Sequence, residues 1–343
     1  MTAVPLAICV PARDEADRLP GLFAALDRLT VPPGIAVTLC LLLDGGSDAS
    51  MAPIAAYRTA GCHRLVVEVA DRGPPNAGRA RDRAMRLGLA SVGQGDAILL
   101  TSDADSLPAP DWLVAMTAAL DHADLVVGDV VRSGRGGNRD QDRIERHYAA
   151  LYALRRRIDP VAWEAPAVHH HASGANMGLR AATYVALGGF LPLARGEDAR
   201  LVDDAARAGM RVRRDAASIV HTSDRRVGRV QGGLATNLCA LDRDGLGAVS
   251  VAHPADQLWQ YRQHAVARRA FASGNFAAIS GVIGLDTDHL LGVARDCPNA
   301  EAFAMRVVPV PPGGMRHIPF VAAEAALALL TASPAAVAAA AAA

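Results

Sequence analysis

Short apolar runs alternate with amphipathic stretches through the first half of this sequence, and that alternation constrains the fold more than any other feature. One amphipathic stretch is Leu19–Leu29, where leucines recur at helical spacing. The apolar runs are Val4–Val10, Val37–Leu43, Leu65–Val69, Ala97–Leu100 and Leu125–Val127. Nearly continuous apolar strands separated by helices are typical of a mostly parallel sheet covered on both faces. We therefore predict an α/β fold, in which ligands bind at the carboxyl ends of the strands.

Acidic residues follow three of these runs at that edge of the predicted sheet. The segment Pro11–Glu15 follows the first run, Asp44 closes the second, and Asp103-Ala104-Asp105 follows the fourth. In extended backbone, residues two apart point the same way, so both carboxylates of the last triplet can face one ion. Mg²⁺ and Mn²⁺ favour such oxygen ligands together with substrate phosphates. An ordinary polar turn before a helix is the alternative, but the neighbouring acidic loops favour a metal site.

Two further segments carry candidate catalytic and phosphate-binding groups. Glu197 and Asp198 open a predicted helix over Ala199–Ala208; acids at a helix start satisfy free amides, and Asp198 is also a candidate general base. Asn76–Arg81 opens another helix, where Gly78 and the arginines Arg79 and Arg81 suit a phosphate contact at the helix N-terminus. A solvated basic face is the alternative for this second helix. Asn176, in Gly174-Ala175-Asn176, is predicted to lie just before a further helix.

Histidines supply a third class of candidates. His221 ends a strand-like run, and its neutral imidazole could complete a metal shell, while Arg225 shortly after it could pair with phosphate. A lone histidine is more often structural, so this prediction depends on its context. The run His169–His171 suggests a metal-binding tract or a substrate contact, although consecutive side chains cannot all face one ion.

Several classes of protein are excluded or disfavoured by what the sequence lacks. All 35 basic residues are arginine, so a lysine Schiff base and a P-loop lysine are ruled out. The formal net charge is zero, which gives no support to nucleic-acid binding through bulk charge. No GxGxxG follows the first apolar run, which disfavours a dinucleotide-binding fold. The five cysteines form no CxxC pair and fit a reducing, cytoplasmic setting.

The chain length, 343 residues, suggests about two domains. We predict a catalytic domain over residues 1–233 and a mostly helical C-terminal region over residues 234–343. Within the first domain, the polar stretch Arg132–Pro166, helical around Arg143–Arg157, is predicted to be an insertion or mobile segment over the site. The only membrane candidate is Val321–Ala343, an Ala-rich stretch that is a weak span, so we predict no transmembrane helix and leave peripheral membrane association open.

Taken in order, seven segments resemble the GT-A fold of family 2 glycosyltransferases over about residues 4 to 230. They are Pro11–Glu15, Asp44, Gly78–Asp82, Asp103–Asp105, Gly174–Arg180, Gly188–Phe190 and Glu197-Asp198. The resemblance implies a Rossmann-like, mixed but mostly parallel sheet flanked by helices. Two departures stand out: Gly45 replaces the second Asp that many members carry after Asp44, and no QxxRW motif is present. The second departure favours single sugar addition over processive polymer synthesis.

The resemblance also implies a reaction and roles for residues. The reaction is transfer of a sugar from a nucleotide-diphosphate donor to an acceptor hydroxyl, with Mg²⁺ or Mn²⁺ bound and the anomeric configuration inverted. Asp198 would be the base, with Glu197 beside it, and Asp103, Asp105 and His221 would bind the metal. The implied donor-binding residues are Pro11, Ala12, Arg13, Glu15, Asp44, Gly78, Arg79, Asp103, Asn176 and Arg225.

Three alternatives remain open at the level of the sequence. A retaining GT-A transferase is the nearest, because His221 and the arginines after it suit that reaction too. A sugar-phosphate nucleotidyltransferase also places acidic metal ligands at the edge of an α/β sheet, but this chain lacks its glycine-rich loop after the first strand. A non-catalytic scaffold would not need Asp103, Asp105 and Asp198.

Overall fold

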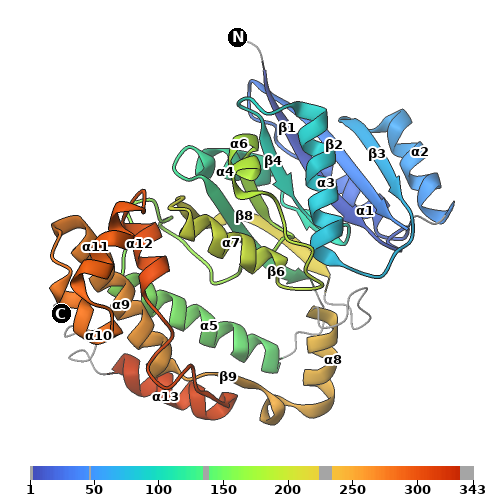
Figure 1. Ribbon diagram of the computed structural model, residues 1–343. Coiled ribbons are helices and arrows are strands. Elements are labelled where there is room, and N and C mark those ends of the chain that lie inside the picture. Colours follow the sequence, from blue (N-terminus) through green and yellow to red (C-terminus); the bar gives the residue numbers. More distant parts are fainter. Residues whose placement is uncertain (1–2, 46–47, 134–138, 224–233, 333–343) are drawn as a thin grey trace. The chain divides into compact units, whose positions relative to one another are not determined.

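The computed structural model describes residues 3–45, 48–133, 139–223 and 234–332 (Figure 1). The chain forms two compact units. The first comprises Met1–Arg135, Trp163–Asp204 and Arg211–Thr236, and the second comprises Gly136–Ala162, Ala205–Met210 and Asn237–Ala343. Residues 136–162 and 205–210, which the sequence analysis assigned to the first domain, thus group with the second unit. The functional division at residue 233 stays a prediction.

A mixed sheet forms the centre of the first unit, and in the described residues it has eight strands in the order β3-β2-β1-β4-β7-β6-β8-β5. The strands are β1 (Val4–Ala12), β2 (Ile35–Asp44), β3 (Arg64–Ala70), β4 (Ile98–Thr101), β5 (Ser106–Pro108), β6 (Leu125–Ser133), β7 (Met177–Arg180) and β8 (Val212–Ser223). Strands β1 to β4 run parallel, as do β6 and β8, whereas β7 and β5 are antiparallel to their neighbours. The predicted mixed, mostly parallel α/β fold is confirmed.

Helices cover both faces of this sheet because its strands are apolar on both sides. The helices of this unit are α1 (Leu19–Leu26), the short 3₁₀ helix η1 (Asp48–Ser50), α2 (Met51–Ala60), α3 (Ala77–Val92), α4 (Trp112–Leu120), α6 (Ala181–Leu187) and α7 (Glu197–Arg207), the last of these as far as Asp204. Leu6 and Ile8 of β1 share a core with Leu22 of α1 and Trp112 of α4. Side chains on the opposite face of β1, such as that of Cys9, lie beneath α3. Both faces of the central strand are therefore buried, as a near-continuous apolar run requires.

Strand register brings the chemically informative loops to one edge. Ala12, at the end of β1, lies opposite Leu43 of β2, one residue before Asp44. On the other side of β1, Cys9 pairs with Thr101, the last residue of β4. Thr101 in turn pairs with Met177, the first residue of β7. The loops after β1, β2 and β4 and the loop before β7 therefore meet at the same end of the sheet.

The second unit is mostly helical, as predicted for the C-terminal region. Its elements are α5 (Arg139–Ile158), α8 (Leu234–Asp244), η2 (Leu246–Ala248), β9 (Ser250–Ala252), α9 (Pro254–Ser273), α10 (Ala277–Ile283), α11 (Thr287–Arg295), α12 (Ala300–Val307), β10 (His317–Pro319) and α13 (Phe320–Ala332). Helix α9 packs against α5, α10, α12 and α13, and β9 pairs with β10. The predicted insertion over Arg132–Pro166 is largely the long helix α5 of this unit.

No helix within the described residues combines the length and the apolar character needed to cross a membrane. The Ala-rich candidate Val321–Ala343 forms helix α13 as far as Ala332, and the rest of it lies outside the described residues. All five cysteines are free. The cytoplasmic setting stays a prediction.

Candidate active site

The Asp103-Ala104-Asp105 triplet forms a turn between β4 and β5. The Ser106 amide donates to the Asp103 carbonyl at 3.1 Å, which closes the turn. The extended backbone predicted for this triplet is therefore wrong, because β4 ends at Thr101 and the chain must reverse to enter β5. Ala104 is buried while both carboxylates are partly exposed, so the two acids still lie toward solvent at the edge of the sheet.

Arg81, predicted only as one of the arginines at a phosphate-binding helix start, lies at the centre of the site. Its side chain is only 8% exposed. Its Nη2 donates to Asp103 Oδ1 at 2.9 Å and its Nε to Glu197 Oε1 at 3.2 Å. Its Nη1 donates to Thr101 Oγ1 at 3.0 Å and to the Gly174 carbonyl at 2.8 Å. One guanidinium on α3 thus joins the end of β4, the acidic turn, the loop before β7 and the start of α7.

The charges around Arg81 oppose the effect of burial. Burial alone would lower its pKa, but the carboxylates of Asp103, Glu197 and Asp198 outweigh burial and raise it. Glu197 is buried, and burial raises the pKa of its carboxyl despite the opposing charge of Arg81. Three carboxylates therefore surround one buried cation, which leaves this edge of the sheet negative.

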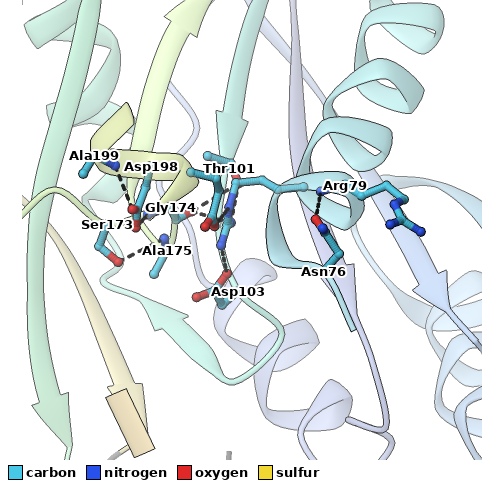
Figure 2. Close-up of polar contacts among 11 residues, drawn as sticks. Asn76, Arg79, Thr101, Asp103, Ser173, Gly174, Ala175, Asp198 and Ala199 are labelled. Carbon is cyan, nitrogen blue, oxygen red and sulfur yellow. Dashed lines mark hydrogen bonds and ion pairs between the residues drawn. The ribbon is translucent and has the colours of Figure 1, made fainter. Parts of the chain in front are cut away.

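The predicted base, Asp198, is held by backbone amides. Its Oδ2 accepts from the Gly174 amide at 3.1 Å and its Oδ1 from the Ala199 amide at 2.7 Å (Figure 2). The Ala199 contact joins neighbouring residues in the first turn of α7, where an acid also interacts favourably with the helix dipole. The Gly174 contact comes from a different part of the chain, the loop before β7. It ties Asp198 to the same loop whose carbonyl binds Arg81.

The predicted nucleoside-binding residues gather at the ends of β1 and β2. Pro11 and Ala12 are the last residues of β1, and Asp44 is the last of β2. Arg13 Nη1 donates to Asp44 Oδ2 at 3.0 Å, while its Nη2 donates to the Gly73 carbonyl at 2.7 Å. Glu15 is buried, and its carbonyl accepts from two amides at the start of α1. Asp44 is thus oriented by a neighbouring guanidinium.

The start of α3 is hydrogen-bonded to segment 190–193, which precedes α7. Asn76 accepts from the Arg79 amide at 2.8 Å as the helix cap, and its amide nitrogen donates to a carbonyl in segment 190–193 at 2.9 Å. Gly78 also donates to this segment at 2.9 Å, and a Cβ at Gly78 would lie 2.0 Å from a carbonyl oxygen there. Gly78 therefore lets the start of α3 pack closely against this segment, because a side chain at this position would clash with it. The Arg79 side chain is exposed and points away from the cluster around Asp103 (Figure 2).

Asn176 lies in the interior of the sheet rather than at its edge. It is fully buried, and it directly precedes strand β7, not the helix predicted there. Its Oδ1 accepts from Trp112 Nε1 at 2.8 Å, and its Nδ2 donates to the carbonyls of Asp129 and Ser218 at 2.8 and 2.9 Å. These contacts bridge β6 and β8 at the irregular register between Gly128 and Asp129. This geometry favours a positioning role over contact with a donor.

His221 lies in β8, between Leu107 of β5 and Val131 of β6, and it is exposed. Within the described part of the chain, the side chains of Asp103, Asp105 and His221 do not gather within 4.8 Å of one another. Arg225, the predicted phosphate partner, lies outside the described residues.

The histidine run after β6 is anchored by its first member. His169 is buried, its Nε2 lies 3.0 Å from the Val127 carbonyl, and its Nδ1 accepts from the His171 amide at 3.1 Å. Burial lowers the pKa of His169 to about 3, so the ring is neutral. Both ring nitrogens are bound to backbone groups, which makes His169 a structural residue rather than a metal ligand.

The turn after β4 offers the donor set that a divalent cation requires. Asp103 and Asp105 supply carboxylate oxygens, and both are partly exposed at the edge where ligands bind in open α/β sheets. Carboxylates combined with substrate phosphates are the usual ligands of Mg²⁺ and Mn²⁺. These residues therefore fit such an ion, with excess negative charge from Glu197 and Asp198 nearby.

Sequence reasoning identified both acidic segments but overlooked the residues that join them. Arg81 stood within the Gly78–Asp82 helix start, where it looked like one arginine among several. The available signal was its spacing: in α3 it is buried with Ala84, Met85 and Gly88 at helical intervals, whereas Arg79 is exposed. An arginine on the apolar face of a helix has to find buried partners.

Comparison with known proteins gives one match in sequence. The family model described as Glycosyl transferase family 2 matches residues 7–184, more than half of the 343 residues. No curated protein sequence matches the chain.

Solved structures give more distant likenesses. TarS 1-349 of S. aureus in complex with UDP-GlcNAc is 15% identical, with a TM-score of 0.49 over 89% of this chain and 90% of that TarS chain. The mannosyltransferase PcManGT of Pyrobaculum calidifontis, in complex with GDP-Man and Mn²⁺, is 16% identical, with a TM-score of 0.47 over 89% and 86%. GalNAc-T7 with UDP, GalNAc and Mn²⁺ is 13% identical, with a TM-score of 0.49 over 91% and 59%.

Proposed function

Because this chain belongs to glycosyl transferase family 2, we propose that it transfers a sugar from a nucleotide-sugar donor to an acceptor hydroxyl. We propose further that the transfer depends on a divalent metal and inverts the anomeric configuration. One observation carries the proposal. The acidic turn Asp103–Asp105 and the predicted base Asp198 meet at the carboxyl edge of the sheet, joined through Arg81 and Gly174. A metal at the leaving diphosphate and a base at the acceptor hydroxyl would together promote attack at a sugar carbon.

The donor would bind across the ends of β1, β2 and β4. Pro11, Ala12, Arg13, Glu15 and Asp44 line the nucleoside side, with Asp44 held by Arg13 at 3.0 Å. Asp103 and Asp105 would hold Mg²⁺ or Mn²⁺ together with the diphosphate, and His221 remains a proposed further ligand. The bound cation would neutralise the charge that develops on the departing diphosphate.

Asp198 would take the proton from the acceptor hydroxyl. As that proton moves to the carboxylate, the acceptor oxygen forms a bond to the anomeric carbon. The bond between that carbon and the diphosphate oxygen breaks, and its electron pair leaves with the nucleoside diphosphate. Attack on the face opposite the leaving group inverts the anomeric configuration. The amides of Gly174 and Ala199 fix the carboxylate of Asp198 for this step.

The test begins with thermal stabilisation by a panel of nucleoside diphosphates and nucleotide sugars, each with and without Mn²⁺. A ligand present at about 100 times its Kd adds roughly 2.7 kcal/mol of stability to the folded state. The nucleotide sugar that binds is then used to measure sugar transfer, or hydrolysis with water as the acceptor.

Asp198→Asn is expected to lower this turnover by a factor of about 100 to 10,000 while donor binding survives. Asp105→Ala is expected to remove the Mn²⁺-dependent part of donor binding. A product with the donor's own anomeric configuration would show a retaining enzyme and remove Asp198 from the role of base. Stabilisation by a triphosphate alone would instead favour a nucleotidyltransferase.

A further inference from the structure

All three side-chain nitrogens of Arg81 donate hydrogen bonds to groups of the proposed site. Nε and Nη2 bind the carboxylates of Glu197 and Asp103, and Nη1 binds Thr101 and the Gly174 carbonyl. Here a planar fork spans two carboxylates, a hydroxyl and a backbone carbonyl from separate segments, which fixes distances between those segments.

Gly174 is the link between Arg81 and the proposed base. Its carbonyl accepts from Arg81, and its amide donates to Asp198 Oδ2. A Cβ at this position would lie 2.3 Å from Arg81 Cζ, so the glycine is required because the guanidinium approaches the backbone closely. Its backbone is not in the left-handed region, so room rather than conformation is the constraint.

We propose that Arg81 is a positioning residue that sets the distance between the metal-binding turn and the base. It holds Asp103 directly, and it holds Asp198 through Gly174 and through Glu197, the residue before Asp198. The inference rests on the proposed function, since it assigns Arg81 a part in aligning the donor with the base. A displacement of about 1 Å in such an arrangement lowers turnover by roughly 100-fold.

Arg81→Lys is the main test, because lysine keeps the positive charge but loses the planar fork. For the nucleotide sugar selected by the binding panel, we expect hydrolysis with kcat lowered by about 100-fold and donor KM changed by less than about threefold. Mn²⁺ affinity, measured by electron paramagnetic resonance of the free ion, is expected to weaken by about tenfold, because groups that orient ligands tune metal affinity. Arg268→Lys is the matched control, a buried arginine between two carboxylates in the second unit.

Gly174→Ala tests the same arrangement without changing any charge. The added methyl group must displace the guanidinium, so kcat is expected to fall while the protein stays folded, as judged by a cooperative thermal transition. Gly95→Ala is its control, because a Cβ at Gly95 meets nothing within 4 Å. The positioning role is overturned if Arg81→Lys and Gly174→Ala keep the wild-type kcat, or if activity falls only in step with the folded fraction.

Asp198→Asn separates this proposal from the one on which it rests. If Asp198→Asn is inactive while Arg81→Lys retains its full kcat, the proposed function stands and the positioning role falls. If Asp198→Asn hydrolyses the donor at the wild-type rate, the assignment of the base falls and the positioning role falls with it. Loss of kcat in Asp198→Asn, Arg81→Lys and Gly174→Ala, but not in the two controls, supports both.

Discussion

Two buried arginines, one in each unit, each bind two carboxylates, and their surroundings differ. Arg81 binds Asp103 and Glu197, and the Asp103 side chain remains 35% exposed. Arg268 of α9 binds Asp159, directly after α5, and Glu301 of α12, whose side chains are only 5% and 9% exposed. The first arginine sits where strands and loops end at the edge of a sheet. The second joins three helices within their packing.

The pKa shifts of the two guanidiniums run in opposite directions. Burial lowers the pKa of Arg268 by more than the attraction of Glu301 raises it, and the nearby positive charge of Arg155 lowers it further. At Arg81 the three carboxylates outweigh burial. The two side chains are similarly enclosed, at 8% and 13% exposed, but excess negative charge at Arg81 suits a further cation, whereas Arg155 adds positive charge near Arg268. We expect Arg268 to act on stability and Arg81 on catalysis.

The largest effect on stability is expected for Arg268→Leu. Removing the guanidinium takes away the ion-pair partner of two buried carboxylates, Asp159 and Glu301, which costs about 3–5 kcal/mol of unfolding free energy. Urea unfolding of the full chain measures this loss. Donor hydrolysis per folded molecule should stay within about twofold of the wild type, and a kcat loss as large as that of Arg81→Lys would break the comparison.

Replacing the whole triad is expected to reverse that loss. The triple variant Arg268→Met/Asp159→Leu/Glu301→Leu removes all three charges of this cluster. Replacing a buried ion cluster by apolar residues is often neutral or stabilising by about 1–4 kcal/mol. The matched replacement Arg81→Met/Asp103→Leu/Glu197→Leu should remove donor hydrolysis whatever it does to stability. Urea unfolding and donor hydrolysis, measured on both triple variants, test these two expectations. A first triple variant no more stable than Arg268→Leu would show that the charges themselves hold the three helices together.

The sheet and the edge that carries the site were predictable from the sequence, because buried parallel strands are apolar throughout and end in polar loops. Val4–Val10 and Val37–Leu43 predicted β1 and β2 to within a few residues, and Asp44 was correctly placed at the end of its strand. The same reasoning missed β7, since Met177–Arg180 is too short to show any periodicity. Its antiparallel pairing with β4 depends on contacts distant in sequence.

The acidic residues of the candidate site stood out in the sequence, whereas the arginine that binds them did not. Carboxylates at strand ends and at a helix start carry a local signal, so Asp103 and Asp198 could be singled out. The spacing of Arg81 placed it on the buried face of its helix, but its role was not predictable, because its partners lie 20 to 116 residues away. Asn176 shows the converse: its position in a motif suggested ligand contact, but its amide bonds to Trp112 and to carbonyls inside the sheet.

A smaller effect, on the pH dependence of stability, is expected for His169. Like Arg268, this buried residue of the first unit is expected to act on stability rather than on catalysis. Its pKa is about 3 in the folded protein and near 6.5 when unfolded, so the unfolded chain binds more protons between these values. Stability is therefore full above pH 6.5 and falls as the pH is lowered, by at most about 1.4 kcal/mol per pH unit from this group.

His169→Gln removes the titrating ring, so the wild type should lose stability more steeply than the variant between about pH 6.5 and pH 5. Urea unfolding across this range compares the two, and the common contribution of the carboxylates cancels in the difference. Parallel stability profiles would show that His169 is not held neutral in the folded state.

The smallest effect is expected at Arg200, which lies on α7 two residues after Asp198. It pairs with Asp204 one turn later at 2.9 Å, but its side chain is 53% exposed, so solvent screens the pair. Arg200→Ala should change the unfolding free energy by less than about 0.5 kcal/mol and leave hydrolysis unchanged. A fall in kcat here would mean that any charge on α7 affects turnover. The contrast drawn between Arg81 and Arg268 would then reflect closeness to Asp198 rather than the contacts that Arg81 makes.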